Sequence, residues 1–106
     1  MDIERLRAYY LSDTVFFTRH AAERCRQRGI TAKDIKDAVM NGEVIEDYPD
    51  DFPFPSCLIL GSVAKIKPLH VCMSDEGSGG RIITAYFPLS ERWDSGFRIR
   101  KEPESS

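Results

Sequence analysis

One histidine and two arginines are spaced as residues that could act together on a phosphate. His20, Arg24 and Arg28 recur at intervals of four, so on a helix with about 100° between residues they lie within about 80° of one another. A guanidinium binds phosphate through a planar fork of donors, and an imidazole transfers protons near neutral pH. The same row has a plainer interpretation as a solvent-exposed face whose arginines form ion pairs. The acidic residues available for such pairs are Glu23, Glu46 and Asp47.

The second histidine, His70, falls in a predicted β-hairpin with a Gly-rich turn. Alternate residues of a strand share a face, so if the hairpin closes symmetrically about Gly77, His70 lies opposite Thr84. Tyr86 then points to the same face, whereas a slip of one residue would send this set to opposite faces. The structural alternative is that His70 is a half-buried strand residue, since Thr and Tyr are themselves ordinary strand formers.

These residue types match the needs of RNA cleavage without a metal. That reaction requires a base for the 2′-hydroxyl, cations for the phosphate and an acid for the leaving 5′-oxygen. We expect His20 and His70 to transfer the protons and Arg24 to stabilise the charge. Hydroxyl groups, a guanidinium and an aromatic ring can bind the substrate, and the expected substrate-binding residues are Arg28, Thr84 and Tyr86. Two histidines without a carboxylate pattern form no recognisable metal-ligand set, so we expect no metal and no cofactor.

Three helices are predicted in the N-terminal part of the chain. Residues 2–11 carry apolar side chains at helical spacing. The second helix is bounded by Thr18, whose hydroxyl can cap the first turn, and by Gly29, which can adopt the left-handed conformation that ends a helix. A third helix begins after Thr31 and ends at the Asn-Gly pair 41–42.

The pattern changes from helical to extended after residue 43. Short strands are predicted at 44–48, 57–60, 69–73 and 81–87. Helices followed by strands with short connections predict an α+β domain, in which two or three N-terminal helices pack on one face of a four-stranded antiparallel sheet. We expect a single domain over residues 1–101, with part of the segment around Trp93 packed, and a disordered tail at 102–106.

Composition and charge narrow the classes of protein to consider. The chain has 106 residues, of which 42% are apolar, enough for one small core. A net charge of -2 excludes a polycation that coats nucleic acid, although residues 19–28 hold four arginines and one glutamate. No run of about 18 apolar residues predicts a membrane span, and the charged N-terminus does not resemble a signal peptide. Three widely spaced cysteines fit reduced, buried thiols, so we expect a cytoplasmic protein.

Four ordered motifs resemble a prokaryotic family of domains of unknown function, DUF4258. They are Phe-Thr-x-His-Ala-x-x-Arg-x-x-x-Arg-Gly-Ile at 17–30, Gly-Glu-x-Ile-Glu-x-Tyr at 42–48, Pro-Leu-His-Val at 68–71 and Ile-Ile-Thr-x-Tyr-x-Pro at 82–88. The resemblance covers roughly residues 16–93, and both histidines fall inside it.

The resemblance implies a relative of the small RelE-type ribonuclease fold, in which helices precede an antiparallel sheet. It also implies that such a protein is a toxin restrained by a cognate antitoxin. We therefore expect a metal-independent endoribonuclease whose partners are RNA and an antitoxin protein. The alternative is a binding module of the same fold that performs no catalysis and uses its basic face to hold a protein or a nucleic acid. The sequence leaves the RNA target and the oligomeric state open.

Overall fold

The computed structural model describes residues 1–102 and contains three helices and five strands in that part of the chain. The helices are α1 (Ile3–Leu11), α2 (Arg19–Gln27) and α3 (Ala32–Asn41). The strands are β1 (Val15–Phe17), β2 (Glu43–Tyr48), β3 (Ser56–Val63), β4 (Lys67–Asp75) and β5 (Gly80–Tyr86). The tail predicted at 102–106 lies outside the described residues, apart from its first residue. No helix within residues 1–102 is both long enough and apolar enough to cross a membrane.

The predicted caps of α2 and α3 are confirmed. The Thr18 side chain accepts a hydrogen bond from the Ala21 amide at 2.9 Å. Thr31 and Asp34 form a reciprocal capping box. Gly29 has a φ of 70°, the left-handed conformation that a glycine adopts at little cost. These caps fix where α2 begins and ends, and so fix the positions of its arginines.

The α+β class is confirmed, but the prediction of a four-stranded antiparallel sheet is wrong. The sheet has five strands in the order β1-β5-β4-β3-β2, and β1 pairs with β5 in parallel. The Thr14 carbonyl accepts from the Gly80 amide at 3.0 Å, and the Thr18 amide donates to the Ile82 carbonyl at 3.4 Å. A strand of three residues is too short to show a period of two, and its partner is distant in sequence, so the pattern gave no sign of this pairing.

The predicted pairing of His70 with Thr84 is also wrong, although the predicted face is right. His70 lies opposite Tyr86, and Cys72 lies opposite Thr84. The pairing of Asp75 with Gly80 centres the turn between residues 77 and 78, which shifts the register by one. A bulge between Cys72 and Met73 shifts it by one more. Together the two shifts move the partner of His70 by two residues, from Thr84 to Tyr86. Because side chains alternate between the faces with a period of two, His70, Thr84 and Tyr86 still share the predicted face.

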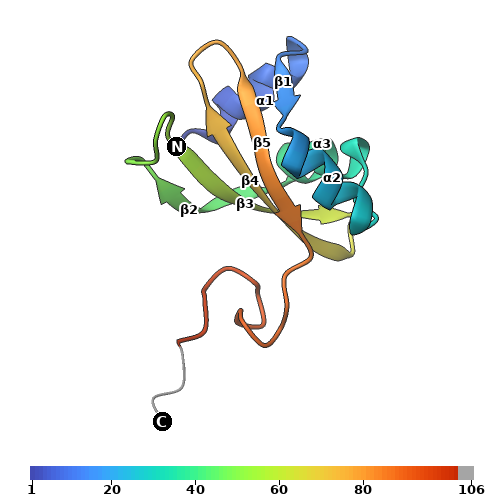
Figure 1. Cartoon of the computed structure of the whole chain (residues 1–106). Helices are drawn as coiled ribbons and strands as arrows, with labels where there is room; N and C mark the ends of the chain where they lie inside the picture. The colour runs from blue at the N-terminus through green and yellow to red at the C-terminus, as the bar shows by residue number, and fades with distance from the viewer. Residues whose placement is uncertain (103–106) are drawn as a thin grey trace.

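The sheet has one face covered by the helices and one face that the helices leave open (Figure 1). The core lies between the helices and the covered face. Its fully buried members include Leu6 of α1, Ile35 and Val39 of α3, and Ile59 and Val71 of the sheet. His70 and Tyr86 belong to the opposite, open face, since their neighbours Val71 and Ala85 belong to the core.

The chain after Pro88 forms a separate structural feature, the C-terminal strap, which we define as residues 89–101. It leaves the end of β5 as a coil without helix (Figure 1). Trp93 and Arg100 form an isolated antiparallel bridge within it. The Asp94 amide donates to the Ile99 carbonyl at 2.9 Å, and the Lys101 amide donates to the Arg92 carbonyl at 2.9 Å. The strap therefore has its own hairpin-like hydrogen bonding, and Trp93, which is only 3% exposed, anchors it to the domain.

A close approach between α3 and β3 predicts the effect of a substitution at Gly61. A Cβ atom there would lie 2.1 Å from the Ala38 carbonyl oxygen and 2.5 Å from the Ala38 Cα. We expect Gly61→Ala to lower the free energy of unfolding by about 2 kcal/mol, because backbone must move to admit the methyl group. Urea unfolding measures this change. Gly96→Ala is the matched control, since its nearest atoms would lie at 3.8 and 3.9 Å, and an equal loss in both variants would contradict the prediction.

Candidate functional site

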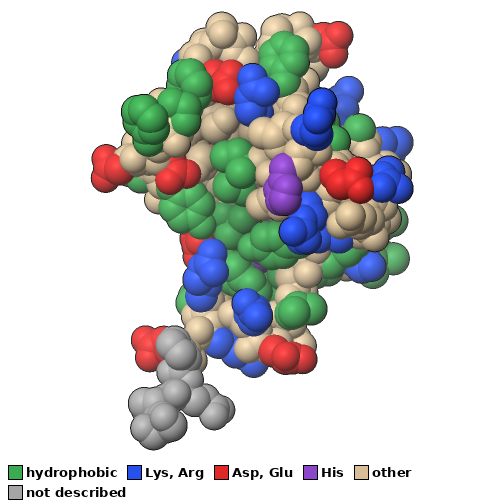
Figure 2. All heavy atoms as spheres, in the orientation of Figure 1, with side chains coloured by type: hydrophobic (Ala, Val, Ile, Leu, Met, Phe, Trp, Pro, Cys, Tyr) green, Lys and Arg blue, Asp and Glu red, His purple; other side chains and the backbone are tan. Residues whose placement is uncertain are grey.

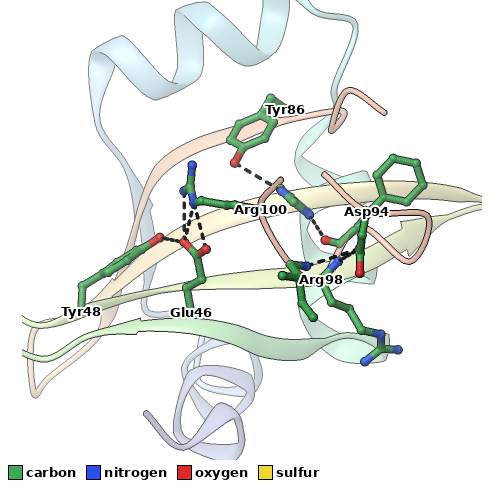
Figure 3. Close-up of polar contacts among 9 residues, drawn as sticks. Glu46, Tyr48, Tyr86, Asp94, Arg98 and Arg100 are labelled. Carbon is green, nitrogen blue, oxygen red and sulfur yellow. Dashed lines mark hydrogen bonds and ion pairs between the residues drawn. The ribbon is translucent and has the colours of Figure 1, made fainter. Parts of the chain in front are cut away.

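His70 is completely buried and both of its ring nitrogens have hydrogen-bond partners. Nε2 lies 2.8 Å from the Phe97 carbonyl oxygen, and Nδ1 lies 3.3 Å from the Tyr86 hydroxyl (Figure 3). A carbonyl only accepts, so Nε2 carries the proton and Nδ1 accepts from Tyr86. His70 therefore links β4 to both β5 and the C-terminal strap.

Aromatic packing completes the surroundings of His70. The Trp93 ring meets it edge to face, with 4.4 Å between centroids and 85° between planes. The Tyr86 ring lies at 5.3 Å and 71°. Burial lowers the pKa of His70 below its ordinary value, and the hydrogen bond to the Phe97 carbonyl opposes that shift. The imidazole is therefore neutral at pH 7, and it holds the strap in place instead of facing solvent.

An ion pair between Glu46 and Arg100 attaches the end of the strap to β2. Arg100 Nε lies 2.9 Å from Oε2 of Glu46, and Arg100 Nη2 lies 3.0 Å from Oε1 (Figure 3). The Arg100 guanidinium also lies over the Trp93 ring, 4.7 Å from its centroid. Hydrogen bonding from Arg100 lowers the pKa of Glu46. The bidentate geometry fixes the guanidinium plane, and Tyr48 contributes a further hydrogen bond to the same carboxylate.

Arg28 joins the C-terminal end of α2 to the end of β5. Its Nη1 donates to the Ala85 carbonyl at 2.8 Å and lies 3.5 Å from the Thr84 hydroxyl oxygen. Strand β1 covers only the first part of β5, because its pairing ends where Phe17 meets Ile82. The Arg28 guanidinium therefore satisfies a carbonyl beyond the end of β1. The remaining N–H groups of the guanidinium are left for other acceptors.

The arginine pocket lies where α2, the end of β5 and the strap meet. It has a volume of about 590 Å³, and its lining residues are Arg28, Tyr86, Phe87, Leu89, Arg92, Trp93 and Arg100. Three arginines and no acidic residue line it. Within residues 1–102, the Arg92 side chain makes no hydrogen bond or ion pair. Lys and Arg side chains border apolar side chains over the strands and the strap in Figure 2. The pocket thus combines cationic donors with aromatic walls.

The structure brings together some of the predicted site residues and separates others. Arg28 and Tyr86 line the arginine pocket, and Thr84 lies beside Arg28. His20 and Arg24 are exposed on α2, two turns and one turn before Arg28. His70 has no exposed surface, so the two histidines do not face a common open cleft.

The ion pairs of the plainer interpretation, between the arginine row and Glu23, Glu46 or Asp47, are absent from the described residues. Glu23 pairs with Arg26, Glu46 with Arg100, and Asp47 with the N-terminal amine. The Arg24 side chain has no hydrogen bond or ion pair in the part of the chain that the structure describes, and neither Arg24 nor Arg28 pairs with an acidic residue there. The row therefore keeps its positive charge uncompensated by direct contacts.

Sequence reasoning missed the contribution of Arg92 and Arg100 to this site. The sequence predicted partial packing of the segment around Trp93. A coil has no periodic pattern that would mark it, and no sequence signal links Arg100 to Glu46, its partner 54 positions away. The available signal was compositional. The chain's single tryptophan and several arginines follow directly after a strand that ends at a proline.

Comparison with known proteins identifies the family. A domain of unknown function (DUF4258) matches residues 17–87, which is more than half of the chain, so the chain belongs to this family. No curated protein and no solved structure matches the chain. His70, Tyr86 and Arg28 fall within the matched segment, whereas Arg92 and Arg100 lie beyond it.

Docking of the strap is expected to depend on pH through His70. Burial in the folded state lowers the pKa of His70. The contribution of His70 to the stability of the docked strap is therefore complete above the pKa of an unfolded histidine, near 6.5, and is lost as the pH falls below that value. We expect Trp93 fluorescence to shift to the red between pH 7 and pH 5, as the indole leaves its buried position.

The control for this titration is His20→Gln, which removes the exposed histidine and leaves His70 intact. The control should keep the transition, and His70→Gln should abolish it. Emission that stays constant between pH 7 and pH 5 in the wild type would contradict the role given to His70.

Proposed function

We propose that this protein binds RNA in the arginine pocket. The observation that carries the proposal is the set of three arginines around one aromatic-lined pocket without an acidic lining residue. Guanidinium groups bind phosphate through paired donors, and aromatic side chains stack on unpaired bases. A volume of about 590 Å³ suits one nucleotide with its phosphate.

The charges within the pocket support phosphate as the ligand. Glu46 already neutralises Arg100, which therefore serves mainly to shape the wall with Trp93. Arg28 and Arg92 retain unpaired donors in the described structure. The site thus offers a net positive charge and two groups that can move onto a phosphate, while Tyr86 and Phe87 supply apolar surface beside them.

Metal-independent RNA cleavage is the second candidate function. The row of His20, Arg24 and Arg28 runs along the exposed side of α2 toward the pocket, and it favours this candidate. His20 would transfer one proton while the arginines hold the phosphate during attack of the 2′-oxygen and departure of the 5′-oxygen. The buried His70 does not reach this face, so binding has more support than catalysis.

The proposed RelE-like relationship and toxin role extend this second candidate. Helices that precede an antiparallel β2-β3-β4-β5 unit are compatible with that fold, and the four sequence motifs are its main support. In this proposal a cognate antitoxin would restrain the protein by covering its basic face.

Arg92 gives the cleanest test of RNA binding. We expect Arg92→Ala to weaken binding of a fluorescein-labelled single-stranded hexauridylate about tenfold in an anisotropy titration, because one phosphate contact is lost without disturbing an internal contact. The slope of the logarithm of the binding constant against the logarithm of the salt concentration should fall by about 0.7. Arg26→Ala is the matched control, since it also removes one arginine but Arg26 pairs with Glu23 outside the pocket. This variant should bind the RNA about as tightly as the wild type. Equal affinities of Arg92→Ala and wild type would contradict the proposal.

Catalysis is tested by His20→Ala in two assays. Purified wild-type protein should cleave single-stranded RNA in the presence of EDTA, and His20→Ala should do so at least 100-fold more slowly. Expression of the wild type alone in a bacterial host should slow growth, and the variant should restore it. Intact RNA and equal growth with both proteins would rule out the catalytic candidate while leaving RNA binding to its own test.

A further inference from the structure

A groove runs beside the edge strand β1, on the helical side of the sheet. One part, of about 550 Å³, is lined mainly by apolar groups where β1 meets α2 and α3. A second part, of about 280 Å³, lies between β1, α1 and α3. Phe17 and Ala32 line both parts, so the two parts adjoin each other.

The main chain of β1 presents free hydrogen-bonding groups along this groove. Thr14 and Thr18 bond to β5 through their main-chain groups, so the alternate residues Val15 and Phe17 direct their N–H and C=O groups away from β5. Strand β1 is the last strand of the sheet on this side. In the described residues no backbone or side-chain group bonds to these four outward groups.

A buried hydroxyl in the same groove also lacks a partner. Tyr10 lines the second part of the groove, and its hydroxyl is inaccessible to solvent without a hydrogen bond in the described structure. Buried polar groups are nearly always hydrogen-bonded. Because this hydroxyl is closed to solvent, an occupant of the groove would bond to it only after the Tyr10 ring moves.

The charged groups that line the groove are mostly basic. They are Arg26, Lys33 and Lys36, against the single acidic residue Asp13. Arg26 and Lys33 also pair with neighbours on their own helices, whereas Lys36 has no ion pair in the described part of the chain. An occupant with acidic side chains would be complementary to this lining.

We infer that β1 is a docking edge for an extended, acidic segment of a partner protein, which adds a sixth strand to the sheet. The four outward main-chain groups of Val15 and Phe17 supply the strand pairing. Alternate apolar side chains of the segment fill the groove beside Phe17 and Ala32, and its acidic side chains face Lys36 and Lys33. Among the described residues none lines both the groove and the arginine pocket, so the two surfaces are separate.

A defined peptide array tests this inference. It holds octapeptides with blocked termini in which Val or Phe alternates with Glu (the Glu series), with Lys (the Lys series) or with Thr. The array is probed with the full-length protein. We expect the Glu series to bind at least tenfold more tightly than the Lys series. Val15→Pro removes an outward N–H without removing a bond to β5, and it should weaken binding of the best Glu peptide at least tenfold.

Charge and assembly controls complete the experiment. Lys36→Glu should reduce binding to the Glu series at least tenfold, whereas Lys65→Glu, an exposed site outside the groove, should not. Backbone amides of Val15 and Phe17 should gain protection from hydrogen exchange on binding. The inference is overturned if no Glu peptide binds or if Val15→Pro has no effect. It is also overturned if sedimentation shows a dimer that Val15→Pro dissociates, because the occupant would then be a second copy.

Discussion

The hydrogen bond from His70 to the Phe97 carbonyl is the contact on which the site depends. Phe97 and Trp93 belong to the C-terminal strap, and His70 reaches both from the middle of β4. His70 also packs against the ring of Trp93, the buried anchor of the strap. The Glu46–Arg100 and Glu43–Arg98 ion pairs that also hold the strap lie at partly exposed positions, and such pairs contribute little in water. Loss of His70 would therefore weaken the attachment of Arg92, Trp93 and Arg100 to the pocket walls. A histidine that resembles a catalyst in the sequence thus acts as a structural link.

The family segment and the strap supply different halves of the arginine pocket. Arg28 and Tyr86 come from the segment that the family shares, whereas Arg92 and Arg100 come from the chain beyond it. Removal of water from the guanidinium groups at an aromatic wall strengthens their attraction for phosphate. Under the proposed RNA binding, the strap would therefore contribute two of the three arginines that line the pocket.

Local patterns predicted most of the fold, and long-range pairing was the part they could not predict. The caps at Thr18 and Thr31 were predicted correctly because a cap is decided by residues three positions apart. The face shared by His70 and Tyr86 was also correct, although two register shifts changed their partners. Strand β1 and the arginines of the strap were missed because their partners, Gly80 and Glu46, lie far away in sequence. Proximity of this kind is set by the packed structure and leaves no periodic signal.

Arginine side-chain NMR can test whether the strap and α2 together form a phosphate-binding pocket. In a ¹H–¹⁵N titration of the Nε–H resonances with single-stranded hexauridylate, we expect the resonances of Arg28, Arg92 and Arg100 to shift together with one binding constant. Arg19 and Arg26, which do not line the pocket, should shift little. Shifts confined to Arg19 and Arg26, or equal shifts of all arginines, would contradict the claim.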